Sequence, residues 1–173
     1  MITEISSKDD LFMAIDKAVS EMVSLMSSLN ETSINSIPYK GSWTAGQLLE
    51  HVTKSTNGMA NAMLMESKPA ERNPGEKIMG LEKAFLDFST KMKSPDFIIP
   101  GAGPYEKQAS IEEINKSFNL FKENTNKANL NDLVKGLPLG EITKLEMLHF
   151  VLYHTQRHLH QLKKIYDALK MNE

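Results

Sequence analysis

The sequence predicts an all-α protein, a bundle of four long helices with a fifth, shorter helix in the connection between the second and the third. Three observations favour this fold class. Apolar residues recur at helical spacing along most of the 173 residues. Residues that cap helix N-termini stand at the start of three of these periodic stretches. No alternating strand pattern or β-hairpin signal competes with the helical pattern.

The first two predicted helices are separated by a polar segment, residues 30–41. In the second helix Thr44 and Gln47 form a capping box, and Trp43 is placed to pack on Leu48 across it. The apolar face of the first helix comprises Leu11, Ile15, Ala18, Met22, Leu25 and Leu29. That of the second comprises Leu48, Val52, Met59 and Met63.

The segment between the second and the third long helix is predicted to form a long crossover connection. Residues 67–75 hold two prolines and a glycine and are expected to form a loop. A shorter helix then follows. Its apolar side comprises Ile78, Leu81, Phe85, Phe88 and Met92. Residues 94–109 hold three prolines and exclude a regular helix. Because two adjacent antiparallel helices need far less chain than this, the connection indicates a crossover.

Two further capping boxes begin the third and the fourth long helix. Ser110 with Glu113 is expected to open a helix that turns isoleucine and phenylalanine side chains inward. Residues 137–140 (LPLG) then separate this helix from the last one, which we expect to begin at Thr143 with Glu146 as its capping partner.

Composition narrows the class of protein. The chain carries 20 Lys and Arg against 22 Asp and Glu, which argues against a nucleic-acid binder with a broad basic face. Cysteine is absent, so disulfides, thiolate metal sites and a cysteine nucleophile are excluded. No stretch is long and apolar enough for a membrane span, and no secretory signal is visible. We therefore expect one cytoplasmic domain over residues 1–173, without a membrane or nucleic-acid partner.

Four of the five histidines lie on the predicted last helix. Helical spacing puts His154 and His158 one turn apart beside the apolar stripe, whereas His149 and His160 fall on a different side and are expected to face outward. Two imidazoles one turn apart can bind the same metal ion. The glutamate of the HExxH motif is missing after His154, so a metalloprotease of that type is disfavoured.

A third ligand must come from another element, and His51 is the only other histidine. Beside it on the second helix Ser55, Gly58 and Ala62 are small, which would leave room for a pocket. The alternative is that these histidines are core side chains hydrogen-bonded to neighbours, which spacing alone does not separate from a metal site. Gln161, on the last helix, is either an indirect partner of the site or a surface amide.

Two segments resemble the DinB/YfiT-like family of metalloenzymes: residues 42–51 (SWTAGQLLEH) and residues 154–162 (HTQRHLHQL). In that family the second helix carries one histidine and the last helix an HxxxH pair. The resemblance implies a four-helix bundle in up-down-down-up order. It also implies that His51, His154 and His158 bind one divalent metal ion, such as zinc or nickel. All-histidine ligation suits copper or iron as well, and the sequence does not choose among these ions.

The resemblance further implies a metal-dependent enzyme acting on a small-molecule substrate, by hydrolysis or by transfer with a low-molecular-weight thiol as cosubstrate. It makes a homodimer the expected assembly. A second hypothesis is a non-catalytic, stress-related or ligand-binding bundle in which the metal is structural. This alternative stays open because no acid–base carboxylate in the sequence pairs with the histidines.

Overall fold

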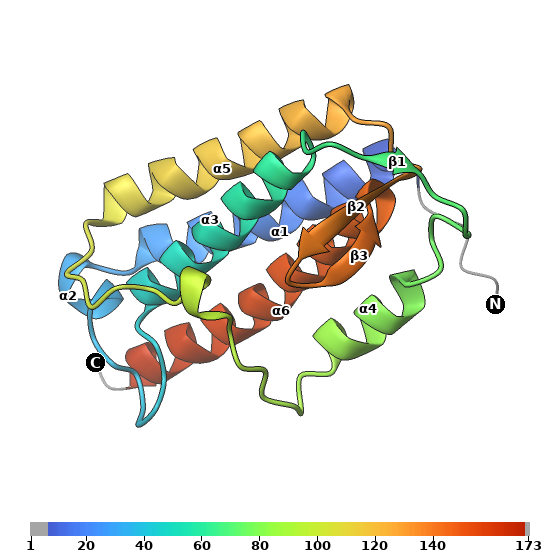
Figure 1. Ribbon diagram of the computed structural model, residues 1–173. Coiled ribbons are helices and arrows are strands. Elements are labelled where there is room, and N and C mark those ends of the chain that lie inside the picture. Colours follow the sequence, from blue (N-terminus) through green and yellow to red (C-terminus); the bar gives the residue numbers. More distant parts are fainter. Residues whose placement is uncertain (1–6, 172–173) are drawn as a thin grey trace.

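The computed structural model describes residues 7–171, and within them four long helices lie together as a bundle (Figure 1). They are α1 (Lys8–Ser28), α3 (Ala45–Ala62), α5 (Lys107–Lys127) and α6 (Lys144–Met171). The short helix α2 (Glu31–Ile34) lies between α1 and α3. The connection from α3 to α5 contains the helix α4 (Ile78–Leu86) and the 3-10 turn η1 (Asp96–Ile98). The predicted four-helix bundle and its extra crossover helix are confirmed.

The helices follow the up-down-down-up order. In Figure 1, α1 runs from right to left, α3 and α5 both run from left to right, and α6 returns to the left. The neighbours α3 and α5 are therefore parallel, and the crossover carries the chain from the end of α3 back to the start of α5. On this path it packs α4 against α6 and η1 against α3.

Two of the three predicted capping boxes are present. The side chain of Thr44 accepts from the backbone N–H of Gln47 at 3.1 Å, and the Gln47 side chain accepts from that of Thr44 at 3.0 Å. Thr143 and Glu146 make the same reciprocal pair at 2.9 and 3.1 Å at the start of α6. These local bonds satisfy N–H groups that a helix N-terminus otherwise leaves without partners.

The predicted start of α5 at Ser110 is wrong. The helix begins one turn earlier, at Lys107, because the carboxylate of Glu106 accepts from the backbone N–H groups of Gln108 and Ala109 at 3.0 and 2.7 Å. The Ser110 hydroxyl instead donates to the Glu106 carbonyl, as a residue inside a helix does.

The expectation that no β-hairpin is present is also wrong. A small antiparallel sheet forms in the order β1-β2-β3. Its strands are β1 (Lys68–Pro69), β2 (Asp132–Leu137) and β3 (Gly140–Thr143). The residues predicted only to separate two helices form the hairpin turn, and Gly136 and Gly140 adopt φ values of +79° and +76° there. Val134 and Ile142 pair across the hairpin and are buried. The residues of β2 (DLVKGL) do not alternate between apolar and polar, so the sequence carried no strand pattern there.

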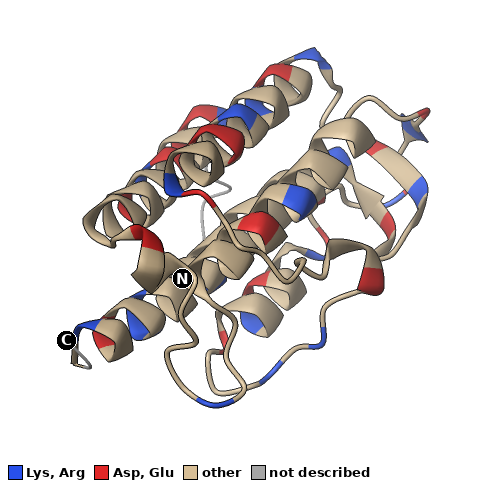
Figure 2. Cartoon of the chain, turned by 90° about the vertical axis from the view of Figure 1, so that its left-hand side faces the viewer, with Lys and Arg blue, Asp and Glu red and all other residues tan. Residues whose placement is uncertain are grey.

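The core runs along the bundle and takes side chains from every long helix. Fully buried members include Ile15, Met22, Met26, Leu48, Leu49, Ile114, Phe121 and Met147. Acidic and basic residues are interspersed over the helices, and neither sign gathers on one element (Figure 2). Between residues 7 and 171 no helix is both long and apolar enough to cross a membrane.

Candidate metal centre

Three histidines from two helices meet inside the bundle. The Nε2 atom of His51, on α3, lies 3.0 Å from Nε2 of His158 and 3.2 Å from Nε2 of His154, both on α6. The candidate ligand atoms of the three side chains all lie within 4.8 Å of one another. Each side chain is buried, with at most 7% of its surface exposed. The structure thus brings together the three residues that the sequence analysis singled out.

Hydrogen bonds on the far side of two rings orient these nitrogens. Nδ1 of His51 lies 3.0 Å from the carbonyl oxygen of Ile98, in η1, and Nδ1 of His158 lies 2.9 Å from Oε1 of Gln161. Both oxygens only accept, so each Nδ1 carries the ring proton and donates it. Each Nε2 then presents a lone pair to the centre. Gln161 is therefore a partner of the cluster rather than a surface amide.

This arrangement fits a divalent metal ion. Two lone pairs 3.0 Å apart, without a proton between them, repel each other unless a cation lies between them. An ion with tetrahedral bonds of about 2.1 Å holds its ligand nitrogens about 3.4 Å apart, only a few tenths of an ångström wider than the observed separations.

Burial keeps the three imidazoles in the neutral form that metal binding requires. It lowers the pKa of His51, and it lowers that of His154 further with the help of the neighbouring His158 and His51. Burial also brings the pKa of His158 down to about 3. At neutral pH the cluster therefore offers uncharged nitrogen ligands rather than protonated rings.

Aromatic side chains surround the cluster. The Trp43 ring, held beside the N-cap of α3, lies 4.9 Å from the ring of His51. Phe150, on α6, and Phe85, on α4, lie 5.3 and 6.2 Å from the ring of His154. These apolar walls exclude water and so strengthen electrostatic interactions inside the site.

The sequence pattern of the DinB superfamily matches residues 14–162, a stretch that contains all three histidines. The chain belongs to the DinB superfamily. No curated protein matches the sequence.

Two solved structures share the fold of this DinB superfamily chain. TT2238, described as a four-helix bundle protein, has a TM-score of 0.60 and 14% identity, covering 91% of this chain and 99% of its own. YfiT from Bacillus subtilis is described as a probable metal-dependent hydrolase with an unusual four-helix bundle topology. It has a TM-score of 0.62 and 12% identity, covering 99% of this chain and 93% of its own. At such identities the likeness establishes the fold alone.

The remaining two histidines of α6 lie outside the cluster, but one expectation about them is wrong. His149 does not face outward: it is 5% exposed, with Nδ1 3.2 Å from the Tyr153 hydroxyl. His160 is half-buried and stacks on the ring of Phe88 at 4.1 Å. Besides the long helices α1 and α3, the crossover helix α4 and the hairpin of β2 and β3 also pack on α6. More of the surface of α6 is therefore buried than a bundle of four helices alone would bury.

The small residues of α3 do not form one flank beside His51. Ser55 and Ala62 are buried, whereas Gly58 lies on the exposed side of the helix, with open space where a Cβ would stand. Gly58 therefore does not border an inner pocket, contrary to the sequence-based expectation.

The sequence analysis did not identify the side chains that hold the crossover close to the three histidines. Arg157, between two of the clustered histidines, donates to the carbonyls of Phe85, Asp87 and Thr90 at 3.2, 2.9 and 2.5 Å. These bonds fix the end of α4 on α6. A second set of side chains, on α3, also holds the crossover. Their signal in the sequence is the i, i+3, i+4, i+7 spacing of polar residues around His51.

Proposed function

We propose that this chain is a metal-dependent enzyme whose divalent ion, zinc or nickel, is held by His51, His154 and His158. The observation that supports it best is the convergence of three Nε2 atoms, with lone pairs on His51 and His158 fixed by hydrogen bonds at the opposite ring nitrogen. Imidazole ligands suit both ions. Three protein ligands leave a coordination position free, which distinguishes catalytic zinc sites from closed structural ones.

The reaction that we propose is transfer of a low-molecular-weight thiol to a small electrophilic substrate. A divalent ion at this position supplies Lewis acidity, which lowers the pKa of a thiol or water and polarises a substrate. The chain has no cysteine, so the thiol must come from a cosubstrate. Hydrolysis is the second candidate, since YfiT, which shares the fold, is described as a probable metal-dependent hydrolase.

A non-catalytic role for the ion is the alternative from a different class. Within residues 7–171 no carboxylate hydrogen-bonds to a ring nitrogen of the three histidines. A site without a carboxylate base is compatible with an ion that only stabilises the fold. Homodimer formation and cytoplasmic location stay predictions, and sedimentation of the purified protein tests the first.

The test begins with elemental analysis of protein purified without a metal-affinity tag. Metal-loaded and metal-free protein are then incubated with glutathione and an electrophilic substrate, and separately with a panel of esters and amides. We expect the metal-loaded protein to turn over substrate. This activity should be lost when a chelator removes the ion and restored when the ion is added back. Loss of melting temperature on chelation, with no turnover in either assay, would favour the structural role.

A further inference from the structure

One face of α3 holds the last part of the crossover, and His51 is a member of that face. Gln47, Glu50, His51 and Lys54 follow the spacing i, i+3, i+4, i+7, which puts their side chains in one row on the helix. All four bind backbone groups of residues 98–101. The carbonyl that orients His51 therefore belongs to a segment that its three neighbours also hold.

Two members of the row bind a carbonyl each. The Gln47 amide donates to the carbonyl of Gly101 at 3.0 Å, and the Lys54 ammonium donates to the carbonyl of Ile99 at 3.0 Å. Both bonds lie near the molecular surface, where a single neutral or screened contact contributes little.

Glu50 is the most connected member of the row. One carboxylate oxygen accepts from the backbone N–H of Gly101 at 2.7 Å and from the hydroxyl of Tyr105, and the other pairs with Lys54 at 3.1 Å. Charge-assisted hydrogen bonds of this kind are about twice as strong as neutral ones. The Glu50 carboxylate therefore ties two points of the crossover to α3.

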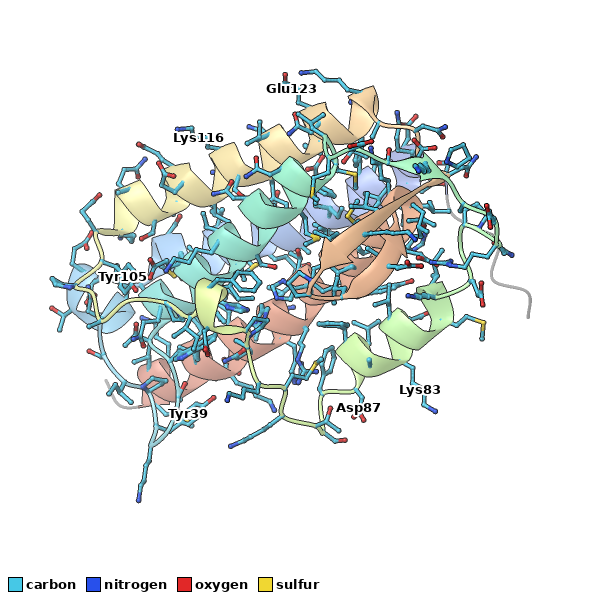
Figure 3. The ribbon with its side chains drawn as sticks, in the orientation of Figure 1. Tyr39, Lys83, Asp87, Tyr105, Lys116 and Glu123 are labelled. Carbon is cyan, nitrogen blue, oxygen red and sulfur yellow. The ribbon has the colours of Figure 1, made fainter. Side chains whose placement is uncertain are left out.

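Tyr105 itself is tightly placed. Its ring packs on Gly46 so closely that a Cβ at that glycine would lie 2.7 Å from the ring. Its backbone N–H donates to Oδ1 of Asn35 at 2.7 Å, and its carbonyl accepts from Nδ2 of the same side chain at 2.8 Å. Figure 3 shows Tyr105 beside the beginning of α3, where the crossover reaches that helix. Glu50 thus connects α3 to an anchored point rather than to a free loop.

We propose that Glu50 is a positioning residue of the three-histidine centre: by holding Gly101 and Tyr105 on α3, it keeps the Ile98 carbonyl on Nδ1 of His51. That bond fixes the tautomer in which Nε2 is the ligand atom. Without the carboxylate the carbonyl moves away from the ring, and the proton of His51 exchanges between both nitrogens. The consequence for metal affinity rests on the proposed function, whereas the consequence for the tautomer does not.

The experiment compares Glu50→Ala with Glu50→Gln and a matched control. Glu123 makes the same i, i+4 pair with a lysine as Glu50 does, at 2.7 Å, but lies on the outer side of α5 (Figure 3). Glu123→Ala therefore removes an equivalent ion pair far from the site. Glu50→Gln keeps an oxygen that accepts from the Gly101 N–H and serves as the conservative rescue.

Two measurements are made on each variant. Long-range proton–nitrogen correlation spectra of the metal-free protein report the tautomer of His51, assigned by its absence in His51→Asn. Competition with a chromogenic chelator reports Zn²⁺ affinity and stoichiometry. We expect Glu50→Ala to lose the Nδ1–H form and to bind one Zn²⁺ about 10- to 100-fold more weakly, while Glu50→Gln loses less than about tenfold and Glu123→Ala is unchanged.

A Glu50→Ala protein that keeps the Nδ1–H tautomer overturns the proposal, even if its melting temperature falls, because Glu50 then only stabilises the loop. An unchanged Zn²⁺ affinity in a protein whose tautomer has changed overturns it as well. Should the unmodified chain bind neither Zn²⁺ nor Ni²⁺, the proposed function fails, and the tautomer spectra alone decide the role of Glu50.

Discussion

Helix α6 contributes to two buried polar clusters, which differ in whether their polar atoms have hydrogen-bond partners within the protein. At its N-terminus the Glu146 carboxylate, fully buried, accepts from Arg72 at 2.7 Å on each oxygen. It also accepts from the backbone N–H groups of Lys77 and Thr143 at 2.8 and 2.9 Å. Burial alone would raise the pKa of Glu146, but these hydrogen bonds outweigh it and hold the pKa below its usual value.

Two turns further along α6 the three-histidine cluster has the opposite property. The outer nitrogens of His51 and His158 are satisfied by oxygens of the protein, while their inner nitrogens face each other at 3.0 Å. The carboxylate cluster is complete without a ligand and joins α6 to the segment before α4. The histidine cluster, by contrast, leaves converging lone pairs that a cation could satisfy. A buried polar group thus indicates a binding site when its lone pairs converge on one another, not when donors meet acceptors.

The largest expected effect is loss of the candidate ligands. We expect His51→Ala, His154→Ala or His158→Ala each to abolish stoichiometric Zn²⁺ binding, because two imidazoles do not hold the ion in competition with a chelator. Equilibrium dialysis with elemental analysis measures it. His149→Ala and His160→Ala are the controls and should retain one ion per chain. Retention of the ion by any of the first three variants would remove that residue from the site.

In the carboxylate cluster, loss of the Arg72 guanidinium should lower the stability of the fold and leave metal binding unaffected. Arg72→Ala strands a buried charge, and we expect it to lower the free energy of unfolding by about 3–5 kcal/mol. Urea denaturation followed by circular dichroism measures the change. The double replacement Arg72→Met with Glu146→Met should recover most of it. A loss below about 1 kcal/mol in Arg72→Ala would show that the pair behaves as a solvated surface pair.

Metal binding at the three-histidine cluster should stabilise the fold independently of the Arg72–Glu146 cluster. With free Zn²⁺ at 100 times its dissociation constant, we expect the free energy of unfolding to rise by about 2.7 kcal/mol. Arg72→Ala should show the same increment, since effects at separate sites add. Thermal or urea unfolding with and without a chelator tests both statements. An increment that vanishes in Arg72→Ala would mean that the two clusters are coupled.

The pH dependence of the metal-free protein provides a smaller test, through His149. Burial lowers the pKa of this ring below its ordinary value of 6.5, so the unfolded chain binds the proton more readily than the folded one. Stability should therefore fall as pH drops below about 6.5, at up to about 1.4 kcal/mol per pH unit for this group. His149→Gln should flatten the dependence measured by urea denaturation between pH 5 and 8. An unchanged slope would contradict the assignment.

The smallest effect is expected at the cap that begins α3. Thr44→Ala removes the acceptor for the Gln47 N–H and should cost about 1 kcal/mol in the free energy of unfolding, whereas Thr44→Ser should cost less. Because the hydrogen bonds of the Thr44 and Gln47 side chains go to each other's residue and to Gly101 rather than to the three histidines, Zn²⁺ stoichiometry should stay at one in both variants. Denaturant midpoints and chelator competition measure the two quantities. Loss of the ion in Thr44→Ala would show that the cap positions His51.

Local sequence patterns predicted most helix positions correctly because a helix is built from contacts three and four residues apart. The capping boxes at Thr44 and Thr143 are bonds between residues three apart, and the structure contains both. The box expected at Ser110 failed because the Glu106 carboxylate caps the N–H groups of Gln108 and Ala109, so the helix begins one turn earlier and Ser110 lies inside it. The hairpin after α5 was missed because β2, with the sequence DLVKGL, does not alternate apolar and polar residues, and β3 has only four residues.

By itself the sequence determined the helices, the crossover and the pairing of His154 with His158 on one turn of α6, since these follow from helical spacing and chain length. The addition of His51 relied on its being the one histidine left and on a family resemblance. Only the tertiary structure decided that His149 is buried, that Arg72 neutralises Glu146 and that Glu50 binds the backbone N–H of Gly101 in the crossover. Each of those facts depends on residues that are distant along the chain and adjacent in space, and no local period in a sequence encodes which of them will meet.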